Sequence, residues 1–262
     1  MTRSTSDICR VMRRIAPPEL AEDWDNVGLL IGDPDDPVDT IRTCLTITSD
    51  VVDQVVELPS CVVIAHHPLP FRPVGRLTPD DYAGGMVRRL IRGGVSVYSA
   101  HTAYDSASGG INDQWCWRLG MEASEPLEVL GDEPVEGSKA VGRGRKGQLR
   151  EAIEASELAR RCSIRRAARV TGDPNRPVQS VAVACGSGGG LLPLVIQAGC
   201  DALVTGEMSY HQCLEARAAG VSVVLTGHFG SERFAMEELA ERLSHEFPDL
   251  NVAPAHECDV VL

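Results

Sequence analysis

Two adjacent histidines, His66 and His67, follow a short apolar run and precede Pro68. The run, residues 61–64, is rich in β-branched side chains and predicts a buried strand that ends at the pair. Ligand sites in open α/β sheets usually lie at such carboxyl ends of strands. Because successive strand residues point to opposite faces, the two imidazoles can share a site only if the strand breaks there. The proline-rich loop that follows is compatible with such a break.

Two other expected strands also end in a histidine, and in each case a carboxylate follows four residues later. The first pair is His101 and Asp105, and the second is His228 and Glu232. A single histidine is usually a core or surface residue. Several histidines and carboxylates that all follow expected strands indicate instead a shared site at the carboxyl ends of those strands.

Together these side chains form a ligand set of imidazoles and carboxylates without a thiolate. One metal ion needs three or four protein ligands, so the set is large enough for two ions. Imidazole and carboxylate suit zinc, manganese, iron, cobalt or nickel, and affinity alone does not choose among them. Two such ions ~3.5–4 Å apart can activate a shared water and stabilise a leaving oxygen. The expected ligands of this dinuclear site are His66, His67, His101, Asp105, His228 and Glu232.

Two further features leave alternatives open. Glu207 and His211 follow another expected strand and could transfer protons, orient metal ligands, or serve only packing or surface roles. The run Gly186 to Gly190 lies between an expected strand and an apolar helix. Its backbone N–H groups could cradle a phosphate, or its glycines could simply allow a tight turn.

Expected strands and helices alternate in both halves of the chain, which predicts an α/β fold. The tetrapeptide Gly-Val-Ser-Val begins an expected strand at residues 94–97 and again at 220–223. This repeat and the shared histidine–carboxylate spacing indicate two similar α/β lobes, with the metal site in the cleft between them. Residues 122–150 lack strong periodicity, so we expect a first lobe at 1–127 and a second at 128–262, which could interleave with the first.

The composition restricts the class of protein. With 262 residues, 43% hydrophobic and 24% charged, the chain is ordinary for a globular protein. A net charge of -12 argues against binding to extended nucleic acid or to an anionic membrane surface. No apolar segment is long enough to span a bilayer, and the nine cysteines form no CxxC pair. We therefore expect reduced thiols and a cytoplasmic protein.

Several short motifs follow one another along nearly the whole chain. They are Trp24-Asp25-Asn26-Val27-Gly28-Leu29, His66-His67-Pro68, His101-Thr102 with Asp105, Gly110-x-Asn112, Thr205-Gly206-Glu207 with His211, and Gly227-His228 with Ser231-Glu232. In this order they resemble the NIF-three-like family, many of whose bacterial members are labelled GTP cyclohydrolase I type 2 homologues.

The resemblance implies a two-lobed α/β subunit with a dinuclear metal centre and a toroidal homohexamer. By this resemblance, the family's metal ligands correspond to the same six side chains that the residue types suggested. The family label implies that water attacks the purine ring of GTP and releases formate, with Glu207 or His211 moving protons. The short junction at 122–150 leaves no room for the domain that some relatives insert between the lobes.

We therefore predict a metal-dependent hydrolase that acts on a small molecule or nucleotide, with GTP as the substrate that the family label implies. A second hypothesis is a dinuclear phosphoesterase that acts on nucleotides or nucleic-acid ends. A third is a protein without enzymatic activity that stores or delivers metal or acts as a scaffold. Release of formate would support the first hypothesis, and release of phosphate would support the second. Bound metal without turnover would support the third.

Overall fold

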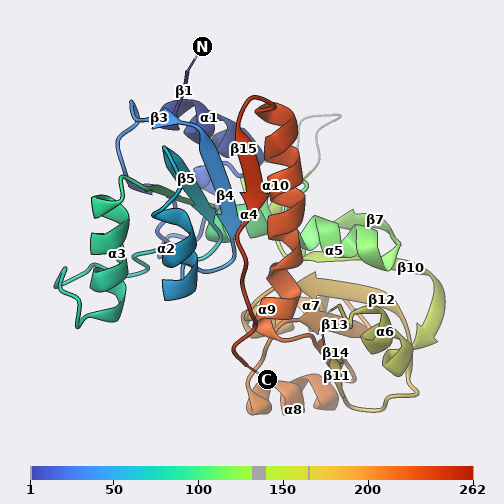
Figure 1. The fold of residues 1–262 in the computed structure, drawn as a ribbon. Helices are drawn as coiled ribbons and strands as arrows, with labels where there is room; N and C mark the ends of the chain where they lie inside the picture. The colour runs from blue at the N-terminus through green and yellow to red at the C-terminus, as the bar shows by residue number, and fades with distance from the viewer. Residues whose placement is uncertain (1, 132–139, 165, 262) are drawn as a thin grey trace. The chain divides into compact units, whose positions relative to one another are not determined.

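The computed structural model describes residues 2–131, 140–164 and 166–261 (Figure 1). It has the predicted mixed α/β fold, and the chain divides into two compact units. Unit 1 comprises Met1–Tyr104 and Arg233–Leu262, and unit 2 comprises Asp105–Glu232. The expected division lay between residues 127 and 128, with interleaving of the two lobes left open. Unit 1 consists of two segments of the chain, because the C-terminal strand pairs with the sheet of this unit.

Unit 1 is built on a five-stranded sheet with the strand order β15-β4-β5-β6-β2. Its strands are β15 (Asn251–Pro254), β4 (Thr40–Cys44), β5 (Cys61–Ala65), β6 (Ser96–Ser99) and β2 (Gly28–Ile31). The first four run parallel, and β2 pairs antiparallel with β6. The carboxyl ends of β4, β5 and β6 therefore lie at one edge of this sheet.

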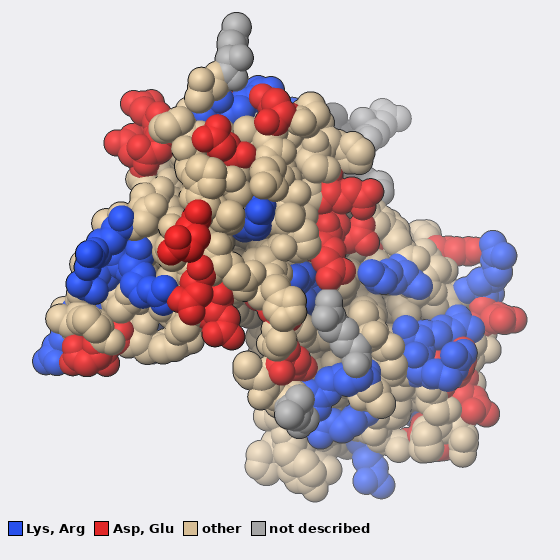
Figure 2. All heavy atoms as spheres, viewed as in Figure 1, with Lys and Arg blue, Asp and Glu red and all other residues tan. Residues whose placement is uncertain are grey.

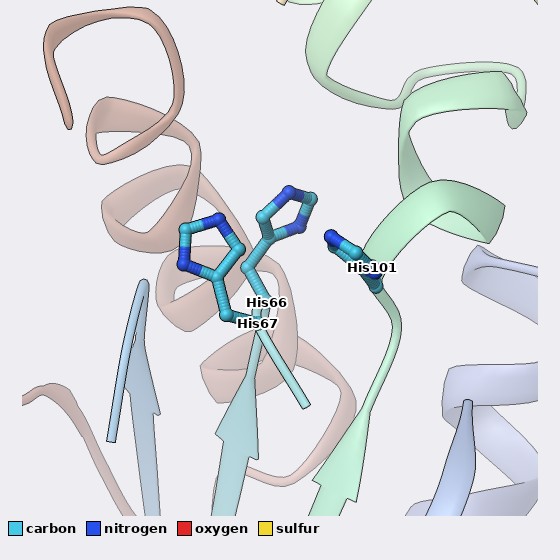
Figure 3. A group of neighbouring side chains, drawn as sticks. All are labelled: His66, His67 and His101. Atoms are coloured by element: carbon cyan, nitrogen blue, oxygen red, sulfur yellow. The ribbon is translucent and has the colours of Figure 1, made fainter. Parts of the chain in front are cut away.

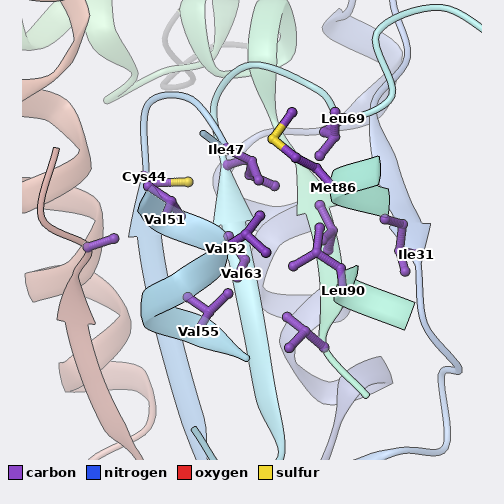
Figure 4. Close-up of a cluster of buried hydrophobic side chains, with 14 of the residues drawn as sticks. Ile31, Cys44, Ile47, Val51, Val52, Val55, Val63, Leu69, Met86 and Leu90 are labelled. Carbon is purple, nitrogen blue, oxygen red and sulfur yellow. The ribbon is translucent and has the colours of Figure 1, made fainter. Parts of the chain in front are cut away.

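Helices α2 (Ser49–Val55) and α3 (Tyr82–Arg92) cover one face of this sheet (Figures 1 and 4). Val51, Val52 and Val55 of α2 are completely buried in the hydrophobic cluster that α2 and α3 form with the strands. Full burial of each such side chain contributes about 1.5–3 kcal/mol relative to exposure. This cluster fixes the strands whose ends carry the histidines.

The other helices and short strands of unit 1 lie around the remaining sides of its sheet. Helix α10 (Phe234–Glu246) contacts β4, where Thr43 Oγ1 donates a hydrogen bond of 2.7 Å to the Met236 carbonyl oxygen. Figure 2 shows acidic side chains along α10 and basic side chains over α3. The remaining elements are β1 (Arg3–Ser4), α1 (Thr5–Ile15), η1 (Pro18–Leu20), β3 (Pro37–Val38) and α10 (Phe234–Glu246).

Unit 2 is built on a six-stranded sheet with the strand order β11-β14-β13-β12-β10-β7. The central strands β12, β13 and β14 run parallel, whereas β10, β7 and β11 pair antiparallel with their neighbours. The ends of the parallel strands again meet at one edge of the sheet. The strands are β11 (Arg169–Thr171), β14 (Ser222–Leu225), β13 (Ala202–Thr205), β12 (Pro177–Ala184), β10 (Arg145–Glu154) and β7 (Met121–Glu125).

Short helices follow the parallel strands of unit 2. Arg145 is buried and forms an ion pair with Asp113 of α5 (Ile111–Leu119), which joins this helix to the sheet. The remaining elements are α5 (Ile111–Leu119), β8 (Glu128–Val129), β9 (Gly142–Arg143), α6 (Ala155–Arg161), η2 (Gly188–Leu191), α7 (Leu192–Gln197), α8 (Tyr210–Ala218) and α9 (His228–Glu232). The helix α4 (His101–Ser106) begins in unit 1 and ends in unit 2.

All nine cysteines carry free thiols, and six of them are buried. Burial raises the pKa of Cys61 to about 12. Such thiols are inert apolar side chains rather than nucleophiles. Among the described helices, we find none with the length and apolar composition needed to cross a bilayer.

Candidate metal centre

His66 and His67 lie directly after β5, which ends at Ala65. Their N–H groups donate to the carbonyl oxygens of Cys44 and Leu45 at 2.9 and 2.8 Å, so the chain stays beside the end of β4. The regular strand nevertheless stops, and the centroids of the two imidazole rings are 5.1 Å apart (Figure 3). The predicted break after the strand is confirmed.

His101 completes a cluster of three imidazoles in unit 1. It follows β6, and its ring centroid lies 5.2 Å from that of His66 and 5.6 Å from that of His67 (Figure 3). One ring nitrogen from each histidine lies within 4.8 Å of the other two. The His101 backbone has a φ of 25°, a strained conformation for a residue with a side chain. Three imidazoles at this spacing fit a divalent transition metal.

Asp25 fixes the orientation of the His101 ring. Its side chain is inaccessible to solvent and accepts hydrogen bonds from His101 Nδ1 at 2.7 Å and Thr102 Oγ1 at 2.5 Å. Burial raises the pKa of the Asp25 carboxyl, but the hydrogen bonds from His101 and Thr102 outweigh burial and lower it to about 2. An ionised carboxylate at Nδ1 holds the proton on that nitrogen and directs Nε2 toward a metal.

His67 has a corresponding partner in Thr46, whose Oγ1 lies 2.7 Å from His67 Nδ1. The loop that carries Thr46 is held by the C-terminal segment. Glu257 accepts hydrogen bonds from the N–H groups of Leu45 and Thr46 at 2.8 and 2.9 Å. The same carboxylate pairs with Arg233 at 2.7 Å. The C-terminal segment therefore positions the residue that orients His67.

Asp25 and Thr46 were not predicted from the sequence as partners of the expected ligands. In the register of the parallel strands, Cys44 pairs with Ala65, so Thr46 and His67 each lie two residues beyond the paired ends. A side chain with an oxygen atom, at the matching position after the neighbouring strand, is the sequence feature that would have identified Thr46 as a partner of His67. For Asp25, the only signal was its place in the motif of residues 24–29.

In unit 2, His228 lies between two carboxylates. Its Nε2 is 3.1 Å from Glu232 Oε2, one helical turn along α9, and its Nδ1 is 3.0 Å from Glu207 Oε1. Hydrogen bonds to Glu232 and then Glu207 raise the pKa of His228 to about 9, against the lowering effect of burial. The imidazole of the metal-free protein is therefore protonated at neutral pH, and it must release this proton to bind a metal.

Asp105, the last expected ligand, is held by the loop after β12. Its Oδ1 accepts a hydrogen bond of 3.1 Å from the Cys185 thiol. Asn112 donates to the Asp105 carbonyl oxygen at 3.0 Å and accepts from the Cys185 N–H at 2.9 Å. Burial, with the nearby charges of Asp105 and Glu232, raises the pKa of Cys185 well above its ordinary value. Without a metal, Cys185 is thus a protonated thiol that donates to Asp105.

Glu207 follows β13 and Gly206, and a Cβ atom at Gly206 would lie only 2.6 Å from Ser231 Oγ. Glycine therefore allows the close approach of the two loops that brings Glu207 to His228. Glu207 also accepts a hydrogen bond of 2.7 Å from Ser187 Oγ. The hydrogen bond with His228 lowers the pKa of Glu207, so this carboxylate is ionised.

His211 lies at the beginning of α8 with an exposed side chain, and its ring contacts that of Tyr210 at a centroid distance of 6.0 Å. A cavity of about 440 Å³ lies between the start of α8 and the glycine loop, and Glu207, Ser187 and Gln212 contribute to its wall. Glu207 is therefore accessible to a solute. Proton transfer by His211 stays a prediction.

The glycine loop after β12 forms a tight turn. The Gly186 N–H donates to Ser231 Oγ at 2.9 Å, and the Gly188 N–H donates to Thr205 Oγ1 at 3.0 Å. Gly186 has a φ of 59°, and a Cβ atom there would collide with the Glu232 carboxylate. These N–H groups bond within the protein, which favours the tight-turn interpretation over a phosphate cradle.

Both units are thus α/β layers with imidazoles and carboxylates after parallel strands, which is the class of protein that the sequence predicted. The chain belongs to the Duf34/NIF3 (NGG1p interacting factor 3) family, whose sequence profile matches residues 3–258. It is 33% identical over 246 residues to the GTP cyclohydrolase 1 type 2 homolog of Clostridium acetobutylicum, covering 93% of this chain and 90% of the relative. It is 35% identical over 248 residues to NIF3-like protein 1 of Drosophila melanogaster, covering 91% and 82%.

Solved structures share this fold. A Bacillus cereus protein related to NIF3 has a TM-score of 0.90 at 22% identity, covering 100% of this chain and 99% of the other. Reduced HcgD from Methanocaldococcus jannaschii has a TM-score of 0.81 at 24% identity, covering 97% and 98%. Such likeness extends over the entire α/β architecture.

Proposed function

We propose that this protein binds two divalent metal ions and is a metal-dependent hydrolase. The observation that carries the proposal is the cluster of three imidazoles in unit 1, two of which are oriented at Nδ1 by oxygen atoms of neighbouring loops. The proposed ligands are His66, His67, His101, Asp105, His228 and Glu232.

The path of the chain supports ligands from both units. His101 and Asp105 lie four residues apart in α4, a spacing that places side chains on one helical face. The chain passes from unit 1 to unit 2 between these residues, and it returns to unit 1 immediately after Glu232. Both crossings therefore occur next to proposed ligands.

A divalent metal in such a site supplies a nucleophilic water at neutral pH and polarises the bond under attack. The protein's own residues would orient the ligands and manage protons. Asp25 and Thr46 hold the rings of His101 and His67. We assign proton transfer to Glu207, since it is ionised, contacts His228 and lies in the wall of a cavity. His211 is the alternative proton carrier.

The first substrate to test is GTP, because relatives at 33% identity are named GTP cyclohydrolase 1 type 2 homolog. Water attack on the purine ring would release formate. The decisive experiment measures formate release by the metal-loaded protein beside a His66→Ala variant and an active cyclohydrolase as a positive control. If only the positive control releases formate, the substrate assignment is wrong. Phosphate release in the same reactions would identify a phosphoesterase, and bound metal without turnover would identify a storage or scaffold protein.

We also propose a toroidal homohexamer located in the cytoplasm. The assembly rests on the family resemblance, and it predicts a sedimentation mass near six times that of the 28.2 kDa chain. A monomer or dimer mass across the accessible concentration range would contradict it.

A further inference from the structure

Two large aromatic side chains of unit 1 are exposed beside the imidazole cluster. Aromatic residues make up only 4% of the chain. Trp24 is nevertheless 61% exposed and Phe71 is 46% exposed. Single exposed apolar residues are common, but two aromatic rings together beside a candidate metal ligand call for a functional explanation.

The two rings and the His101 imidazole form one cluster. The ring centroids of Trp24 and Phe71 are 6.0 Å apart, and those of Trp24 and His101 are 5.9 Å apart. Phe71 lies 6.1 Å from His101, and the three interplanar angles lie between 69° and 86°. These edge-to-face contacts stabilise the arrangement while much of both aromatic side chains stays exposed to solvent.

Hydrogen bonds hold this cluster in place. The loop that carries Trp24 is fastened on one side by the Glu22 N–H, which donates to Thr102 Oγ1 at 3.0 Å. On the other side, Asn26 Nδ2 donates to the Pro70 carbonyl oxygen at 2.8 Å, next to Phe71. The rings are therefore displayed on anchored loops, as a binding surface requires.

We propose that Trp24 and Phe71 bind the planar aromatic ring of the substrate, of which a nucleobase is the biological example. The proposal rests on the proposed function, because it places this ring beside the ligands of the metal centre. Aromatic side chains bind such rings by stacking, and stacking accepts any base because every base has a π-face. Two side chains are too few for a stable protein interface but sufficient for one ring.

Guanosine 5′-monophosphate and adenosine 5′-monophosphate are suitable probes, with ribose 5-phosphate as the control that lacks a base. Titration of the metal-free protein removes any contribution from phosphate–metal contacts. We expect both nucleotides, but not ribose 5-phosphate, to quench tryptophan fluorescence and to bind in calorimetry. Trp24→Leu should weaken nucleotide binding at least about fivefold, the lower limit for losing one stacked base. Phe71→Leu should weaken it less.

Trp117→Phe is the matched control, because Trp117 is 56% exposed but lies in α5 of unit 2. It should leave nucleotide affinity unchanged. Equal affinity in Trp24→Leu and the unsubstituted protein overturns the inference, as does equal binding of ribose 5-phosphate or no binding at millimolar nucleotide. A changed sedimentation mass with unchanged affinity in Trp24→Leu identifies a contact between copies instead, and also overturns it.

Metal titration of the same proteins separates this inference from the proposed function. If Trp24→Leu binds metal normally but loses nucleotide affinity, the inference stands together with the metal binding on which the proposed function depends. If the unsubstituted protein binds no metal, the proposed function fails, whereas stacking is still decided by the metal-free titrations.

Discussion

The two units surround their histidines differently. In unit 1, three imidazoles lie together, and the carboxylate of Asp25 contacts His101 only at Nδ1. In unit 2, both ring nitrogens of His228 face carboxylates, which raises its pKa to about 9. The contacts in unit 1 orient the imidazoles toward a metal. Those in unit 2 keep the His228 imidazole protonated, and a metal must displace this proton to bind. Histidines at similar positions after parallel strands therefore differ in their chemistry, because different oxygen atoms lie next to their rings.

The largest effect is expected from His66→Ala, which removes the buried central ligand of the unit 1 cluster. We expect bound metal per chain to fall sharply, because the unit 1 cluster keeps only two of its three imidazoles and five proposed ligands are too few for two ions that each need three or four. Elemental analysis of the purified protein measures this ratio. His245→Ala, at an exposed position of α10, is the control and should retain its metal. Unchanged metal content in His66→Ala would falsify the role of this cluster.

A smaller loss is expected from Asp25→Asn, which keeps the size of the side chain but removes the charge that holds His101 Nδ1. Loss of such an outer partner typically lowers metal affinity about 10- to 100-fold. Competition with a calibrated chelator gives the dissociation constant. Asp23→Asn changes an exposed carboxylate in the same loop and should have no effect. If both variants bind metal equally well, the Asp25 contact does not orient a ligand.

Thr46→Val should weaken metal binding about tenfold, at the lower end of the range for outer partners, because a neutral hydroxyl is lost rather than a carboxylate. The same chelator competition measures the change. Thr46→Ser retains the hydroxyl and should restore most of the affinity. A serine variant as weak as the valine variant would assign the effect to packing.

The smallest effect concerns pH and the metal-free protein. Because the folded-state pKa of His228 exceeds its ordinary value of 6.5, its carboxylate contacts stabilise the fold fully below about pH 6.5. This stabilisation is lost as the pH rises through about 9. Titration of the ring by NMR should give the raised pKa, and Glu232→Gln should lower it toward the ordinary value. A ring that titrates near 6.5 in the unsubstituted protein would remove the contrast between the units.

Several features of the fold followed from local sequence alone. The apolar run before His66 predicted a buried strand, and Pro68 with its neighbours predicted the break that follows. The alternation of strands and helices predicted the α/β class. These features were predictable because hydrophobic periodicity and proline act over a few residues. The limits of the units were not predictable in this way, because β15 joins β4 across more than two hundred residues of sequence.

The sequence by itself determined which side chains could bind a metal and that they follow strands. Only the tertiary structure decided their partners. Because β2 is antiparallel to β6, with Gly28 beside Ser99, the loop before β2 meets the residues after β6, and Asp25 reaches His101. Glu257 reaches the loop of Thr46 by an equally long-range route. Strand pairing brings together residues that are distant in sequence, so it depends on the whole packed core and not on any local pattern.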